Sequence, residues 1–127
     1  MTDTRVYFAG EGSYKIMLRM WDTARGWTGS LTGGDSPHVG GVILATPRPR
    51  TSGGGLTCDL YVVPVHGHKD TEGAMASAKR LCVNLNVPIV LTCGIHKDKA
   101  SGDDIRLILA NCDEVVTRFL EDVAPSR

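Results

Sequence analysis

Hydrophobic residues recur at every second position in the first half of the chain and at every third or fourth position in two later segments. The first spacing is typical of half-buried strands and the second of amphipathic helices. Short runs rich in glycine and proline separate the apolar segments, as expected for turns. The pattern predicts strands over residues 5–9, 13–21, 27–32, 39–45, 56–65 and 87–93.

Two segments carry the helical spacing. The first covers residues 70–85, and its small and apolar residues form one stripe: Ala74, Ala78, Leu81, Cys82 and Leu85. The second covers residues 101–123. It begins with Ser101 and Asp104, which have the spacing of a capping box. Its apolar stripe runs from Ile105 to Val123 and is best explained by core packing.

The order of the elements predicts how the sheet is assembled. Residues 56–65, the first helix and residues 87–93 form a strand–helix–strand unit, whose two strands are usually parallel neighbours. The consecutive strands 39–45 and 56–65 are expected to pair antiparallel. Because residues 39–45 are nearly all apolar, we expect both faces of that strand to be covered. The polar stretch 47–55 is expected to be a loop.

Together these elements predict an α+β fold, a two-layer sandwich with a mixed, mainly antiparallel sheet and two helices on one face. The chain has 127 residues, which is enough for one core, and we expect a single domain over residues 1–127. Helices on one face would leave the other face partly apolar and uncovered, so a homo-oligomer is expected.

Charge and composition narrow the function. The formal net charge is zero, so nothing suggests nucleic-acid binding or a polybasic membrane anchor. No apolar stretch reaches the roughly 20 residues of a spanning helix, and the N-terminus lacks the pattern of a signal peptide. The four cysteines have no C-x-x-C spacing and lie in apolar runs, as expected for reduced core cysteines in a cytoplasmic protein.

All four histidines lie in three turn-like segments beside glycine or proline: 37–41, 66–70 and 94–98. The predicted topology brings these segments to one edge of the sheet, where ligands of open parallel sheets bind. Both helices begin at the same edge, and their free N–H groups attract anions, phosphate above all. Lys69 and Lys97 add positive charge in corresponding places. The edge is therefore predicted to hold an anionic or phosphorylated ligand, with imidazoles for a metal or for proton transfer.

A histidine at a strand end is more often an ordinary turn residue, and only the clustering favours a site. Within the cluster, His38, His68 and His96 are the best candidates for metal ligands, whereas His66 is expected to be exposed. Asp70 is as well explained as a helix N-cap as it is by a place in the site. The spacing matches no standard zinc motif, so the sequence does not identify a metal.

Several segments in this order resemble the LpdD-like family, the small D subunit of gallate decarboxylase operons. The matching segments run from about residue 10 to about residue 119 and comprise Gly10–Tyr14, Gly33–Gly40, His68–Asp70 and Gly94–Ser101. The family accompanies decarboxylases of the UbiD type, which use prenylated FMN, and its members are regarded as carriers or chaperones of that cofactor.

The resemblance implies a non-catalytic protein that binds prenylated FMN and delivers it to, or matures it for, a UbiD-type decarboxylase. By position, it implies a ligand site at His38, His68 and His96, with Lys69, Asp70 and Asp98 beside them. Gly40 and Gly41 would let the flat ring lie close to the backbone, and Lys97 would lie near the phosphate. A divalent metal bridging phosphate and imidazoles is compatible with this set.

Two other functions remain open on the sequence. One is a small metal-dependent hydrolase or lyase, with His38, His68 and His96 holding the metal and Asp70 or Asp98 as the base. The other is a purely structural decarboxylase subunit. The histidine segments contain no Glu or Tyr as an obvious acid/base partner, which favours binding over catalysis.

Overall fold

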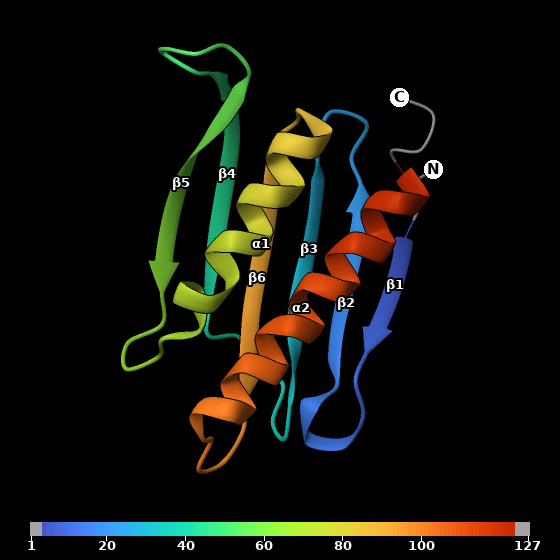
Figure 1. Ribbon diagram of the computed structural model, residues 1–127, viewed down its shortest axis with the longest axis vertical. Coiled ribbons are helices and arrows are strands. Elements are labelled where there is room, and N and C mark those ends of the chain that lie inside the picture. Colours follow the sequence, from blue (N-terminus) through green and yellow to red (C-terminus); the bar gives the residue numbers. More distant parts are fainter. Residues whose placement is uncertain (1–3, 124–127) are drawn as a thin grey trace.

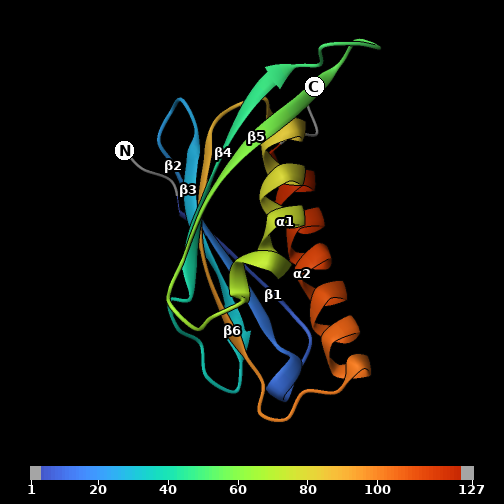
Figure 2. The same cartoon turned by 90° about the vertical axis from the view of Figure 1, so that its left-hand side faces the viewer.

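Six strands form one mixed sheet, and both helices cover the same face of it (Figures 1 and 2). The computed structural model describes residues 4–123. This architecture confirms the predicted two-layer α+β sandwich. The elements are β1 (Thr4–Ala9), a 3-10 turn (Gly12–Tyr14), β2 (Ile16–Asp22), β3 (Trp27–Gly34), β4 (Gly41–Pro49), β5 (Leu56–Pro64), α1 (Asp70–Leu85), β6 (Ile89–His96) and α2 (Gly102–Val123).

The strand order is β1-β2-β3-β6-β4-β5. β6 lies between β3, to which it is parallel, and β4, to which it is antiparallel. The expected direct pairing of β5 with β6 is therefore wrong, because β4 separates them. The physical reason is burial: Ile89 and Leu91 of β6 are fully buried and require a central position, whereas β5 is half-exposed and forms the edge.

The direction of the strands is nevertheless as expected. β5 and β6 both run antiparallel to β4, so their carboxyl ends lie at the same edge of the sheet. The start of β4 and the start of α2 lie at that edge as well (Figure 1). The predicted convergence of the histidine segments therefore does not depend on which strands are neighbours.

The core lies between the sheet and the helices. The alternation in β2 buries Ile16, Leu18 and Met20 completely against the helices. From α2, the fully buried Phe119 packs edge-to-face on Trp27 at 4.9 Å between ring centroids. Truncation of such a buried aromatic side chain costs about 3–5 kcal/mol.

β4 differs from its prediction in two ways. Only one of its faces is covered within this chain, because Ile43 is fully buried whereas Leu44 is 37% exposed. The strand also extends to Pro49, so the expected loop over residues 47–55 shortens to its second part. Pro47 and Pro49 are tolerated because β4 pairs with β5 alone beyond Ala45, and a missing N–H there interrupts no ladder with β6.

The predicted start of α2 is confirmed in detail. The backbone N–H of Ser101 donates to Asp104 Oδ2 at 3.0 Å, and the N–H of Asp104 donates to Ser101 Oγ at 3.1 Å. This reciprocal pair is a capping box. Neither helix of the described residues is long and apolar enough to cross a membrane. Cys58, Cys82, Cys93 and Cys112 are free thiols, as predicted, although Cys58 is only half-buried.

Candidate functional site

The three histidine segments meet at one edge of the sheet, as the sequence predicts. His38 precedes β4, His68 precedes α1, and His96 ends β6. The ring centroid of His38 lies 5.0 Å from that of His68 and 6.5 Å from that of His96. His38 is therefore the centre of the group.

Asp70, the first residue of α1, joins the three segments. Its Oδ2 lies 3.1 Å from His38 Nε2 and 3.3 Å from His68 Nδ1, and its Oδ1 accepts a hydrogen bond from the backbone N–H of Ile95 at 3.0 Å. Burial alone would raise the pKa of this carboxyl group, but the Ile95 N–H and the histidines outweigh it and lower the pKa. The side chain of Asp70 therefore lies with the histidines and contacts β6, and α1 has no side-chain cap.

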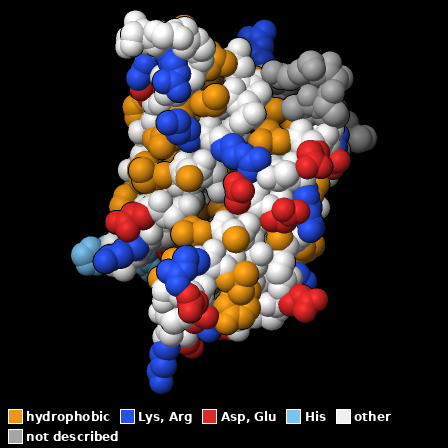
Figure 3. Space-filling model, viewed as in Figure 1, with side chains coloured by type: hydrophobic (Ala, Val, Ile, Leu, Met, Phe, Trp, Pro, Cys, Tyr) orange, Lys and Arg blue, Asp and Glu red, His pale blue; other side chains and the backbone are white. Residues whose placement is uncertain are grey.

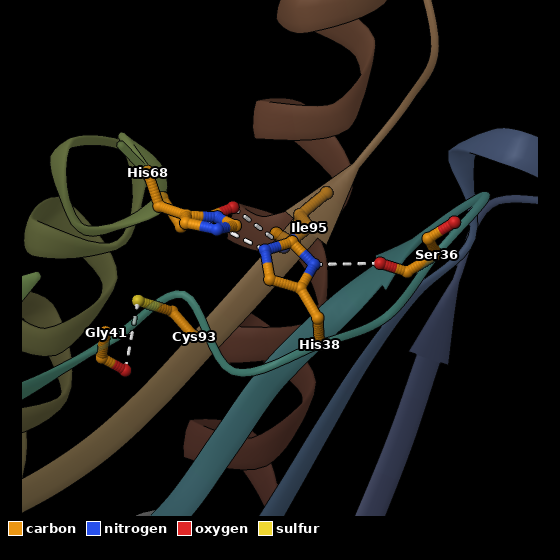
Figure 4. Close-up of polar contacts among 7 residues, drawn as sticks. Ser36, His38, Gly41, His68, Cys93 and Ile95 are labelled. Carbon is orange, nitrogen blue, oxygen red and sulfur yellow. Dashed lines mark hydrogen bonds and ion pairs between the residues drawn. The ribbon is translucent and has the colours of Figure 1, made fainter. Parts of the chain in front are cut away.

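His38 is held from both sides (Figure 4). Its Nδ1 lies 2.9 Å from the carbonyl oxygen of Ser36, and its Nε2 faces the Asp70 carboxylate. The hydrogen bond to Ser36 raises the pKa of the imidazole; burial opposes this, and Asp70 supports it. Both ring nitrogens of His38 thus face oxygen acceptors, an arrangement suited to a bound cation or a second proton.

His96 contacts Asp98, whereas His38 and His68 contact Asp70. His96 Nε2 lies 2.8 Å from Asp98 Oδ1, and its side chain is half-exposed. Asp35 supports this connection, because its Oδ2 accepts a hydrogen bond from the backbone N–H of Asp98. Lys97 turns away: its Nζ lies 3.6 Å from Asp104 Oδ2 and 5.5 Å from the centroid of the Tyr14 ring.

Gly40 and Gly41, which the resemblance places beside the flat ring of a ligand, lie against the start of α1. A Cβ at Gly40 would lie 2.0 Å from Asp70 Oδ2, and one at Gly41 would lie 2.4 Å from a methyl carbon of Thr71. Both glycines thus face the first turn of α1 and let the helix start directly against β4. Gly94 is tighter still, because its Cβ would lie 1.6 Å from the carbonyl oxygen of His38.

A cavity of about 680 Å³ opens between the histidine segments and the two helices. His38, His68, Lys69, Asp70 and His96 form its polar side, whereas Gly40, Gly41, His66 and Lys97 are not among its lining residues. Its apolar side comes from α2, chiefly Ile105, Ile108 and Leu109. Figure 3 shows histidine side chains at the left edge of the helix-covered face.

The sequence pattern does not predict the apolar lining. Its spacing places Ile105 and Leu109 in the core-facing stripe of α2, yet their side chains are 49% and 43% exposed. The one available signal is that the stripe is wider at the start of α2 than a single core-facing row requires. One wall of polar groups and one wall of aliphatic groups suit a ligand with one polar and one apolar end.

The charges around the cavity do not by themselves favour an anion. Lys69 supplies one positive charge, but Asp70 and Glu72 lie beside it in the first turn of α1. The first turn of α2 also contains Asp103 and Asp104, and its capping box already occupies part of its N-terminal N–H groups. A phosphate at this edge would therefore be served mainly by α1, Lys69 and the histidines.

Comparisons with known proteins identify the fold and the family of this chain. No curated protein matches the sequence. A solved structure described as "Crystal Structure of a Novel Chaperone Complex for Yeast 20S Proteasome Assembly" has the same fold, with a TM-score of 0.60 and 13% identity over 98% of this chain and 96% of that chain. At that identity only the fold is shared.

The family comparison is specific. The family model described as "Prenylated flavin chaperone LpdD-like domain" matches residues 10–124, which include every segment of the cavity. This chain therefore belongs to the LpdD-like prenylated flavin chaperone family.

Proposed function

We propose that this protein binds prenylated FMN in the cavity between the histidine segments and α2, and delivers it to a UbiD-type decarboxylase or matures it for that enzyme. The observation that carries the proposal is a cavity of about 680 Å³ with one polar and one aliphatic wall in a member of a prenylated flavin chaperone family. Cavities that take cofactor-sized ligands typically measure about 300–1,000 Å³.

The polar wall of the cavity suits the phosphate of prenylated FMN, and the aliphatic wall suits its ring system. Ile105, Ile108 and Leu109 offer an apolar surface for the prenylated ring system. Lys69 and His68, which line the cavity at the start of α1, can donate hydrogen bonds to the phosphate. Glycines do not provide the ring surface in this proposal, because Gly40 and Gly41 face α1.

Ligand retention tests the proposal. Purified protein is mixed anaerobically with prenylated FMN, FMN or riboflavin, desalted, and measured by absorbance. We expect prenylated FMN to be retained best and riboflavin least, because riboflavin lacks the phosphate. Leu109→Glu should abolish retention, whereas Leu107→Glu is the matched control, since Leu107 is similarly exposed on the same helix but does not line the cavity. Equal retention of riboflavin would contradict the phosphate site.

The partners and location are part of the proposal. We expect the protein to work in the cytoplasm, where its free thiols stay reduced. We also propose that a second copy covers the open face of the sheet, which exposes large apolar side chains, among them Phe8, Leu44, Tyr61 and Val63. Leu44→Lys should lower the molar mass measured by light scattering, and Leu107→Lys on the helical face should not.

A small metal-dependent hydrolase or lyase remains the second candidate. The grouping of His38, His68 and Asp70 favours it, because these side chains could hold a catalytic ion. The sequence predicts His38, His68 and His96 as the metal ligands. In this candidate Asp70 takes the place of His96, because Asp70 is the residue that lies with His38 and His68. Activity assays of the protein alone separate this candidate from the carrier.

A further inference from the structure

We propose that His38, His68 and Asp70 form a site for one divalent transition-metal ion in the wall of the cavity. Each residue offers one ligand atom, and these atoms all lie within 4.8 Å of one another. They come from three segments that only the fold brings together: the β3–β4 connection, the β5–α1 connection and the start of α1.

The distances suit coordination. Ions such as Zn²⁺ bind nitrogen and oxygen ligands at about 2.0–2.2 Å, which places neighbouring ligand atoms about 3.0–3.5 Å apart. The Oδ2 atom of Asp70 lies 3.1 Å from His38 Nε2 and 3.3 Å from His68 Nδ1. The remaining pair, His38 Nε2 and His68 Nδ1, lies within 4.8 Å, so the two rings would have to turn toward each other for all three atoms to reach one ion.

Neighbouring backbone groups orient the side chains of His38 and Asp70, as groups around metal ligands usually do. A histidine ligand typically donates its second ring N–H to a carbonyl or carboxylate group. In the tautomer with hydrogen on Nδ1, His38 donates to the carbonyl oxygen of Ser36, and the lone pair of Nε2 is free for an ion. The second oxygen of Asp70 is fixed by the N–H of Ile95. An ion between His38 and Asp70 would replace the proton that joins Nε2 to the carboxylate in the metal-free protein.

The ligand types indicate the class of ion. Two imidazoles and one carboxylate suit Fe²⁺, Co²⁺, Ni²⁺ or Zn²⁺, whereas Mg²⁺ and Ca²⁺ prefer oxygen ligands alone. Three protein ligands leave at least one coordination position open. All three residues line the cavity, so a bound molecule can supply the remaining ligand.

A bound divalent ion would also offset the negative charges of Asp70 and Glu72 in the cavity. Asp70 and Glu72 repel an anion at the start of α1, and Lys69 alone offsets only part of this. A divalent cation held by Asp70 reverses the local sign and can bind a phosphate oxygen directly. This bridging role, unlike the metal site itself, rests on the proposed binding of prenylated FMN.

Co²⁺ alone is the first probe. Untagged, chelator-treated protein is titrated with Co²⁺ and followed by visible absorption, which reports coordination. We expect binding of one equivalent, and we expect His68→Ala to weaken it about 10-fold or more, by the scale of losses at metal sites. The matched control is His66→Ala, because His66 is exposed and does not line the cavity. No binding by the wild type, or an equal loss in His66→Ala, overturns the site.

A second variant guards against misfolding. Asp70→Asn keeps an oxygen that can accept the Ile95 N–H but removes the negative charge, so we expect a native circular dichroism spectrum and a similar loss of Co²⁺ binding. Undiminished Co²⁺ binding by folded Asp70→Asn overturns the assignment of Asp70.

The bridging role has its own readout. Co²⁺ should increase FMN retention by the wild type but not by Asp70→Asn, and it should not affect riboflavin. Stoichiometric Co²⁺ binding without any effect on FMN overturns bridging and leaves the metal site in place. Retention of FMN without Co²⁺ binding overturns the metal site and leaves the proposed function in place.

Discussion

At the scale of single residues, the site depends on places where backbone segments almost touch. Gly94 in β6 lies against the carbonyl of His38, and Gly40 lies against Asp70. The same close approach brings the His38 ring to the carboxylate. The contact between His38 and Asp70 therefore requires glycine at positions 40 and 94, because a Cβ at either position would collide with one of these two residues.

We predict that Gly94→Ala destabilises the protein and displaces His38. The added Cβ would lie 1.6 Å from the backbone oxygen of His38, and backbone cannot give way as a flexible side chain can. Overpacking of this kind typically costs about 1–3 kcal/mol, measured by urea denaturation. Gly73→Ala is the control: its Cβ meets only a Leu109 methyl group at 3.4 Å, and removal of glycine from the interior of α1 should stabilise it by about 1 kcal/mol.

The His38–Asp70 pair predicts the pH dependence of the metal-free protein. The pKa of His38 is raised above 6.5, so its contribution is complete below that pH and is lost as the pH rises through the folded-state value. The pKa of Asp70 is lowered below 3.8, so its contribution is lost as the pH falls through its own folded-state value. The pair should therefore stabilise the fold most between about pH 4 and 6.5.

Thermal melts of chelator-treated protein test this prediction. The melting temperature should fall as the pH rises from 6 to 8, and His38→Gln should flatten that fall. His66→Gln should retain the slope of the wild type. A slope that His38→Gln leaves unchanged would mean that other groups set the pH dependence.

At the scale of elements, the two helices begin at the site in different ways. α2 closes its own N-terminus with the Ser101–Asp104 capping box. α1 has no side-chain cap at Lys69, and the carboxylate of its first residue is used for the site instead. The first backbone N–H groups of α1 therefore have no side-chain cap, unlike those of α2, and they lie beside the cavity.

We predict that Ser101→Ala lowers the free energy of unfolding by about 1 kcal/mol, because it removes the acceptor for the Asp104 N–H. Denaturant unfolding measures this change. Ser52→Ala, an exposed substitution in the β4–β5 loop, should change stability by less than about 0.5 kcal/mol. An equal effect of both variants would show that the cap contributes nothing measurable.

At the scale of the whole molecule, one face of the sheet is covered by helices and the other is open. The cavity opens at one end of the covered face, so the proposed ligand and the proposed second copy occupy different surfaces. The chain could therefore hold a cofactor and an interface at the same time.

We predict that the purified protein has no decarboxylase activity alone but raises the active fraction of a UbiD-type decarboxylase produced in the same cell. The reason is that the family to which the chain belongs is described as a prenylated flavin chaperone family. Leu109→Glu should remove the effect while the partner is still expressed and folded, and Leu107→Glu should not. Turnover of an aromatic acid by this chain alone would favour the metal-dependent enzyme.

Local sequence patterns are enough to predict most of the strands, both helices and the edge of the sheet at which the histidines meet. Alternation in β2, the helical stripe of α2 and the Ser101–Asp104 spacing are local signals, and each is set by neighbours a few residues away. The shared edge followed from strand direction alone, which is why it was correct although the pairing of β5 with β6 was not.

The order of the strands and the grouping of the site residues depend on contacts between distant segments. The insertion of β6 between β3 and β4 depends on which strands bury most apolar surface, a competition among segments far apart in the chain. The His68–Asp70 and His96–Asp98 contacts are local, because each joins residues two positions apart. The contact of Asp70 with His38, in contrast, joins residues 32 positions apart and depends on the packing of β4 against α1. Periodicity carries no information at that range, because it records only which face of its own element a residue occupies.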